Sequence, residues 1–165
     1  PLYEGERLVD ICAFILMSNH YHFLLRPRQD NGLALFLQKL GDGYTGFFNL
    51  KHARVGALFQ GRFKIKRIDS DQYGRYIQAY IALNALDRAM PEWRQRGIQN
   101  RDRAVKILRS HPWSSYGSYI GDNAFKDILD PMFLNEFFDS AKDFETFTLS
   151  VTGDDLNDIR LITAG

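Results

Sequence analysis

Two histidines near the start of the chain carry the clearest chemical signal. His20 and His22 flank Tyr21 within an apolar run over residues 11–26. Because side chains alternate across a β-strand, both imidazoles would point to one face and Tyr21 to the other. Two imidazoles held side by side on a strand form half of a site for a divalent metal. The pattern therefore predicts a metal centre mounted on a sheet.

A second set of polar side chains lies on a predicted helix farther along the chain. Tyr73, Tyr76 and Tyr80 are spaced by three and four residues, which puts them on roughly one helix face. An aromatic stripe packed on the sheet is the plainest explanation for such a trio, and it stays open. Asn84 follows Tyr80 by one turn, so a hydroxyl and an amide oxygen would project together. If this face meets the histidines, a nucleophile stands beside a metal held by two imidazoles and an amide oxygen.

That combination suits the cleavage and rejoining of a phosphodiester. A bound metal withdraws charge from the phosphate oxygens. A tyrosine oxygen that attacks phosphorus becomes covalently linked, which splits strand transfer into two reversible steps. The phosphotyrosine keeps the energy of the broken bond, so rejoining needs no nucleotide cofactor. Imidazole ligands suit Mn²⁺ better than Mg²⁺, although either ion could serve.

The net charge of +1 hides a local basic block. Residues 51–68 contain six basic side chains and no acidic one, whereas the tail over 153–160 carries Asp154, Asp155 and Asp158. A basic block with interleaved aromatic residues matches a nucleic-acid backbone. A solvated strand edge, where lysines discourage aggregation, explains it equally well. The basic residues are Lys51, Arg54, Arg62, Lys64, Lys66 and Arg67.

Composition and length narrow the class of protein. The 165 residues suit a single domain, and 45% apolar content argues against disorder. The single cysteine, Cys12, reads as a buried apolar residue in a reducing compartment. No apolar stretch is long enough to span a bilayer and no signal peptide is visible, so we expect a cytoplasmic protein. Trp113 and Tyr116 have two interpretations, packing in the core or as a lid, which we favour, and stacking on bases.

The periodicity of apolar residues predicts a mixture of strands and helices. We expect an α+β fold in which helices pack on an antiparallel sheet. Gly41 and Gly43 would weaken the first helix in its middle, and Asp69 with Gln72 resembles a capping box for the second. The expected strands cover residues 8–17, 20–26 and 57–68, and the expected helices cover 33–50, 70–86, 100–109 and 131–150.

Four segments in this order resemble the single-tyrosine HUH transposases, and most closely their IS200-like and REP-associated members. His-x-His alone occurs often by chance, but four motifs in sequence are specific. They cover the chain from residue 8 to about 120. The segments are 17–25 with the histidines, 44–64 with the basic block, 80–84 with the tyrosine and asparagine, and 112–116 with Pro-Trp-Ser-Ser-Tyr.

The resemblance implies a ferredoxin-like antiparallel sheet with packed helices and assigns roles to the residues above. His20 and His22 become metal ligands for Mg²⁺ or Mn²⁺, Tyr80 the nucleophile and Asn84 the third ligand. The family cuts single-stranded DNA at hairpin-bearing ends, leaving a 5′-phosphotyrosine and a free 3′-OH. Relatives work as homodimers or as monomers, and both states stay open here. The DNA-binding residues implied are Lys51, Arg54, Arg62, Lys64, Lys66 and Arg67.

The chain also departs from the family. We expect a catalytic domain over 1–120 and a helical extension with an acidic tail over 121–165. The family's usual first strand and helix do not precede Leu8, so either the chain is a fragment or another segment or subunit covers the exposed sheet edge. Ala85 replaces a proline, which changes the helix end and leaves the chemistry untouched. A relative that binds hairpin DNA without cutting it is the alternative function.

Overall fold

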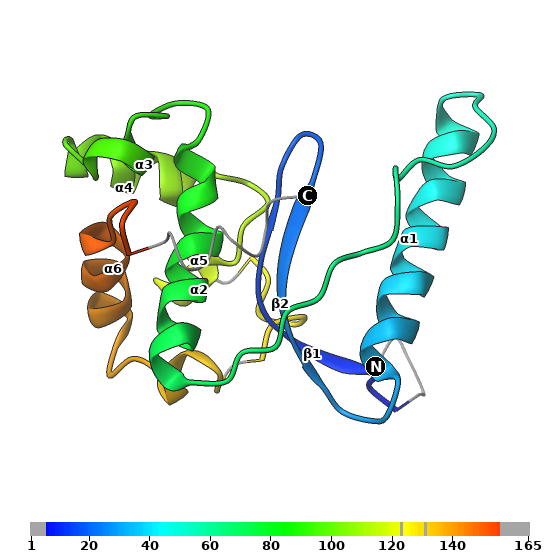
Figure 1. The fold of residues 1–165 in the computed structure, drawn as a ribbon, viewed down its shortest axis with the longest axis horizontal. Coiled ribbons are helices and arrows are strands. Elements are labelled where there is room, and N and C mark those ends of the chain that lie inside the picture. Colours follow the sequence, from blue (N-terminus) through cyan, green and yellow to red (C-terminus); the bar gives the residue numbers. More distant parts are fainter. Residues whose placement is uncertain (1–5, 123, 131, 156–165) are drawn as a thin grey trace. The chain divides into compact units, whose positions relative to one another are not determined.

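A computed structural model describes residues 6–122, 124–130 and 132–155. Within these ranges the fold is mixed α+β, with one two-stranded antiparallel sheet and six α-helices (Figure 1). The chain divides into two compact units. The first unit comprises Pro1–Asp10 and Leu25–Lys66, and the second comprises Ile11–Leu24 and Arg67–Gly165. The α+β class expected from the sequence is confirmed.

The two strands are β1, Val9–Leu16, and β2, Tyr21–Pro27, so the strands predicted over 8–17 and 20–26 are confirmed. They are joined by a tight turn in which the Met17 amide donates to the His20 carbonyl over 2.8 Å. β1 is buried at almost every position, which is typical of a strand covered on both faces. The hydrogen bond from Met17 to His20 closes the turn between the two strands.

The helix that follows the first unit is α2, Asp71–Leu83, continued by a 3₁₀ turn over Asn84–Leu86. Its beginning and end agree with the predicted helix over 70–86. The predicted cap was wrong, because Ser70, not Asp69, is the extended residue before the first turn. The Ser70 hydroxyl accepts a hydrogen bond from the Tyr73 amide over 3.3 Å.

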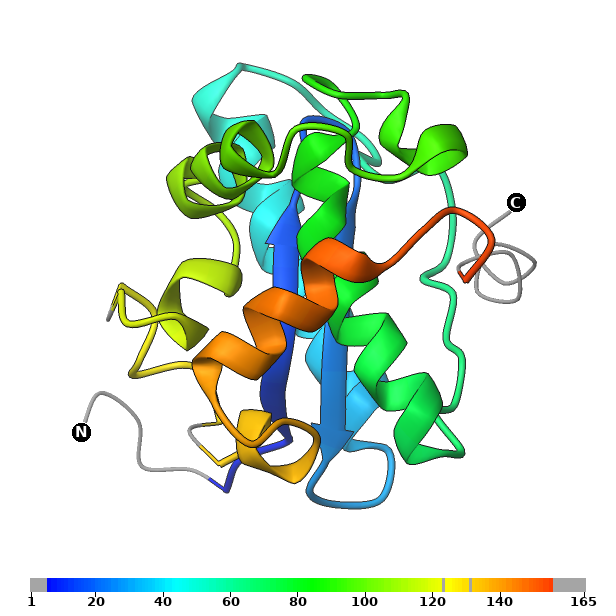
Figure 2. The same ribbon diagram turned by 90° about the vertical axis from the view of Figure 1, so that its left-hand side faces the viewer.

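In the second unit α2 lies between the hairpin and α6, Ala141–Ser150 (Figure 2). The predicted helix over 131–150 was wrong in its first half. Only a 3₁₀ turn, Leu134–Glu136, forms there, and residue 131 lies outside the described residues. Ser140 is the reason, because its extended backbone and its bond from the Asp143 amide start a new helix.

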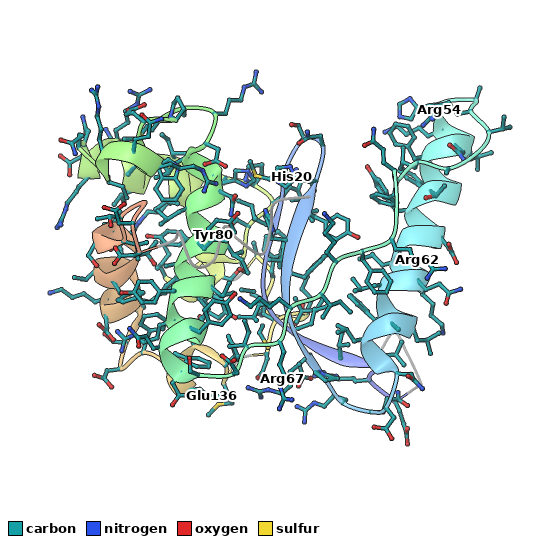
Figure 3. The ribbon with its side chains drawn as sticks, in the orientation of Figure 1. His20, Arg54, Arg62, Arg67, Tyr80 and Glu136 are labelled. Atoms are coloured by element: carbon teal, nitrogen blue, oxygen red, sulfur yellow. The ribbon has the colours of Figure 1, made fainter. Side chains whose placement is uncertain are left out.

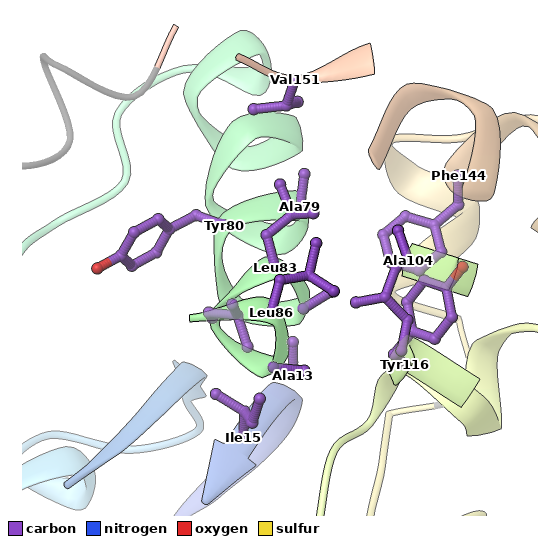
Figure 4. Packing of buried hydrophobic residues seen from close by; sticks show 14 of the residues in the cluster. Ala13, Ile15, Ala79, Tyr80, Leu83, Leu86, Ala104, Tyr116, Phe144 and Val151 are labelled. Carbon is purple, nitrogen blue, oxygen red and sulfur yellow. The ribbon is translucent and has the colours of Figure 1, made fainter. Parts of the chain in front are cut away.

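The core of the second unit forms where α2 meets the surrounding helices (Figure 4). Leu83 and Leu86 point toward Ala104 and Tyr116, whereas Tyr80 projects from another side of α2. The helix predicted over 100–109 is confirmed, and its cap is Asn100. The remaining helices of this unit are α3, Trp93–Arg96, α4, Arg101–Ser110, and α5, Tyr116–Tyr119.

The first unit contains α1, Gly32–Lys51, and an irregular segment over 54–66. α1 runs without a break through Gly41 and Gly43, because glycine lowers helix propensity but keeps the backbone hydrogen-bond donor. The strand predicted over 57–68 was wrong, since the described chain forms no strand there. Strand propensity is expressed only where a neighbouring strand offers hydrogen bonds and a packing face.

Candidate active site

The two predicted histidines belong to the hairpin in the second unit, where His20 lies near the turn (Figure 3). His20 ends the turn and His22 is the second residue of β2. Their ring centroids are 5.1 Å apart with the rings nearly perpendicular. The Nδ1 atom of His20 lies 2.8 Å from the Asn19 side-chain oxygen, a contact that orients its ring. The hairpin therefore brings the two imidazoles together.

Tyr80 is the tyrosine of α2 that meets this pair. Its ring centroid is 5.5 Å from that of His22, edge to face, and its residue is 5% exposed. Tyr76, one turn earlier, packs on Phe147 of α6 at 5.2 Å instead. The two side chains thus contact opposite neighbours of α2, although their spacing places them on one helical stripe. Tyr80 is the candidate nucleophile that the fold brings to the histidines.

The environment of His22 keeps its imidazole neutral. Its pKa is lowered to about 4, mainly by burial and further by the charges of His20 and Arg94, while Asp87 opposes the shift. Its Nε2 atom is buried and has no hydrogen-bond partner among the described residues. A neutral ring with an unpartnered nitrogen is the form in which histidine binds a metal.

The Asn84 side chain is fixed at both ends. Its nitrogen donates to the Tyr80 backbone carbonyl over 2.7 Å, and its oxygen accepts from Nη2 of Arg94 over 3.1 Å. The sequence predicted that the amide oxygen and the Tyr80 hydroxyl project together. Instead, the amide closes the end of α2 and its oxygen faces Arg94. An amide oxygen has two lone pairs, so one remains for a ligand.

Arg94 and Asp87 are site residues that sequence reasoning missed. Nε and Nη2 of Arg94 donate to the two carboxylate oxygens of Asp87 over 2.8 and 2.6 Å. The guanidinium carbon lies 5.5 Å from the centroid of the Tyr80 ring. Burial lowers the pKa of Arg94, but Asp87 and Tyr80 raise it by more, so the group stays charged. The pair is seven residues apart across an irregular turn, where no local spacing rule joins two side chains.

The resemblance implies a bound divalent metal, and the predicted ligands provide part of what such a metal requires. The two histidines fit, because their rings are adjacent and the buried Nε2 of His22 has no partner. Asn84 stays a predicted third ligand through its remaining lone pair. No group of three or more His, Cys, Asp and Glu side chains that could hold a metal ion is found within the described ranges.

The six predicted DNA-binding residues are all exposed. Five belong to the first unit and Arg67 to the second. Two of them lie over aromatic rings of α1, with Lys51 5.7 Å from the Phe47 centroid and Arg54 5.6 Å from that of Phe48. These contacts place two cations at the end of the helix.

Trp113 and Tyr116 have opposite environments. Tyr116 is fully buried, and its hydroxyl donates to Glu145 over 3.0 Å, so the core interpretation is confirmed for it. Trp113 is 57% exposed, so the core interpretation was wrong for it. The reason is its backbone, since its carbonyl accepts from the Leu16 amide at the edge of β1 and leaves the indole outside. In the tail, Asp158 lies outside the described residues.

No protein-family model, curated protein or solved structure matches the chain. Among the described residues, none of the helices is both long and apolar enough to cross a membrane. The arrangement of side chains around Tyr80 is therefore the basis for a functional proposal.

Proposed function

We propose that this protein cleaves and rejoins single-stranded DNA through a covalent link to Tyr80, as the HUH transposases that it resembles do. One observation carries the proposal. The Tyr80 ring lies 5.5 Å from His22, whose buried Nε2 has no partner in the described chain, and His20 lies alongside. A tyrosine with a purely structural role would not need a buried imidazole with an unsatisfied nitrogen at its side.

The reaction proposed for Tyr80 is a phosphoryl transfer. Its hydroxyl oxygen attacks the phosphorus of a DNA phosphodiester and forms a new O–P bond. The bond from phosphorus to the 3′ oxygen breaks. Tyr80 gives up its proton to solvent, and the 3′ oxygen takes up a proton from solvent and leaves as a free 3′-OH. The DNA 5′ end is then held as a phosphotyrosine. Attack by a 3′-OH on this link rejoins a strand and restores Tyr80.

His20 and His22 would hold the divalent metal, with Asn84 as the predicted third ligand. When bound, Mn²⁺ or Mg²⁺ supplies positive charge that polarises the scissile phosphate. The depressed pKa of His22 keeps its ring neutral and available at physiological pH. We also propose that the hairpin and α2 are parts of a ferredoxin-like fold.

The substrate proposed is single-stranded or hairpin DNA. The exposed basic residues of 51–67 supply the charge that a phosphate backbone requires, and no acidic residue interrupts them. Binding by these residues without cleavage at Tyr80 is the alternative function. A homodimer is compatible with either function.

The test is incubation with short single-stranded hairpin oligonucleotides and Mn²⁺ or Mg²⁺, followed by a denaturing gel. We expect a metal-dependent protein–DNA band for the wild type and for Tyr76→Phe, the matched control that lies one turn away. Tyr80→Phe should reduce adduct formation by about 10⁴-fold or more, because it removes the attacking oxygen. Its binding of the same oligonucleotide should stay nearly unchanged.

Two results would contradict the proposal. An undiminished band in Tyr80→Phe would assign the nucleophile to another residue. Oligonucleotide binding by the wild type, with no covalent band under either metal across a panel of hairpins, would favour the binding protein over the transposase.

A further inference from the structure

The guanidinium of Arg94 contacts both Tyr80 of α2 and Asn84 of the 3₁₀ turn that continues the helix. Arg94 donates to Asn84, and its guanidinium lies over the Tyr80 ring. We propose that Arg94 is a positioning residue, which is held by Asp87 and in turn fixes the Tyr80 ring and the Asn84 amide in one arrangement. The inference rests on the proposed function, since it concerns the orientation of the nucleophile.

The position of Arg94 is itself strongly determined. The Asp87 carboxylate accepts both Nε and Nη2 in a two-pronged pair. Trp93 is fully buried, donates its indole nitrogen to the same carboxylate over 2.9 Å, and lies with its ring 4.7 Å from the guanidinium. The Arg94 side chain is only 21% exposed. A side chain with this many fixed partners can act as a template for its neighbours.

The fixed position of Arg94 has two consequences, one for Asn84 and one for Tyr80. The Asn84 amide has one orientation, because a flipped amide would turn its donor nitrogen toward the donors of Arg94. The Tyr80 ring has the cation on its face and the His22 ring at 73° to it. Since Asn84 also bonds to the Tyr80 carbonyl, the amide, the ring and the guanidinium form one connected group.

Orientation has a large effect on a phosphoryl transfer. Attack requires the nucleophile in line with the leaving oxygen, and a displacement of about 1 Å can reduce the rate by about 100-fold. The planar fork of the guanidinium bonds both Asp87 oxygens and Asn84 while its carbon lies over the Tyr80 ring. The ammonium of lysine keeps the charge and loses the fork. Arg94→Lys therefore separates geometry from charge.

The experiment compares single-turnover adduct formation with the Kd for the same hairpin oligonucleotide. We expect Arg94→Lys and Asp87→Asn each to slow adduct formation by about 10–100-fold while the Kd stays unchanged. The double variant should be no slower than the slower single variant, because both changes disrupt one group. The matched control is Arg96→Lys, an exposed arginine of the same short helix, which should behave as wild type.

Other outcomes overturn the inference. A Kd that weakens as much as the rate would make Arg94 a DNA contact, and an unchanged rate would give it no role in positioning. Additive effects on the rate in the double variant would mean that Arg94 and Asp87 act independently. If Asp87→Asn does not fold, the rate and the Kd of Arg94→Lys alone test the positioning role of Arg94.

A second readout needs no activity, so it separates this inference from the proposed function. In ¹⁵N-labelled protein without DNA, the side-chain amide signals of Asn84 should shift in Arg94→Lys and stay in place in Arg96→Lys. An absence of adduct in the wild type would count against the proposed function alone. Unshifted Asn84 signals in Arg94→Lys would overturn the positioning role.

Discussion

Helices α1 and α2 follow each other along the chain and differ in how they are stabilised. α1 has 20 residues, of which only Gly32 and Leu37 are buried, whereas α2 has 13 residues, of which seven are buried. A helix with few buried side chains depends on local propensity, while a packed helix depends on its neighbours. The packed helix carries Tyr80, and the proposed nucleophile needs that rigidity more than the proposed DNA-binding residues do.

Gly74 of α2 and Gly43 of α1 show the same contrast in packing. A Cβ added at Gly74 of α2 would lie 2.6 Å from the nearest ring atom of Phe137, so this glycine permits close packing. A Cβ added at Gly43 of α1 would meet no atom within 4 Å. Contacts therefore require a glycine at position 74 of α2 and do not require one at position 43 of α1.

The largest expected difference between the two helices is the loss of stability when one leucine in each is replaced by alanine. Leu83→Ala in α2 should lower the free energy of unfolding by about 2–5 kcal/mol, because the residue is fully buried and truncation leaves a cavity. Leu50→Ala in α1 should change it by less than about 0.5 kcal/mol, because Leu50 is 86% exposed. Urea unfolding of both variants measures this, and equal losses would break the contrast between the helices.

The second difference concerns DNA binding. Lys64→Gln with Lys66→Gln should lower the slope of log K against log salt by about 1.4, because each phosphate contact on a single strand contributes about 0.7. Adduct formation at saturating DNA should stay unchanged. The matched control is Lys126→Gln with Lys142→Gln, two exposed lysines of the second unit, which should leave the slope as in wild type. An unchanged slope in the first pair would remove those lysines from the interface.

The smallest expected effects on the free energy of unfolding come from two glycine substitutions, and they have opposite signs. Gly43→Ala should raise the free energy of unfolding by about 0.5–1 kcal/mol, because alanine is the better helix former. Gly74→Ala should lower it by about 1 kcal/mol, because the strain of the contact with Phe137 exceeds that gain. Thermal unfolding of the two variants measures both. Stabilisation by Gly74→Ala would mean that the ring moves aside easily.

Local signals predicted most of the secondary structure and failed where a partner was needed. The two strands and the helices that begin near residues 33, 70 and 100 were predicted from the periodicity of apolar residues. The strand expected over 57–68 does not form, because its residues favour a strand only beside another strand. The helix expected from 131 began ten residues late, because the Ser140 cap was overlooked within an apolar pattern.

The sequence by itself determined which residue types are available for chemistry. The spacing of His20 and His22 matches the repeat of a strand, and the spacing of Tyr80 and Asn84 matches one turn of a helix. Only the tertiary structure decided that Tyr80, and not Tyr76, faces His22, and that Arg94 with Asp87 joins the site. Local repeats set which side chains share a face, whereas packing between distant segments selects the neighbours that the face meets.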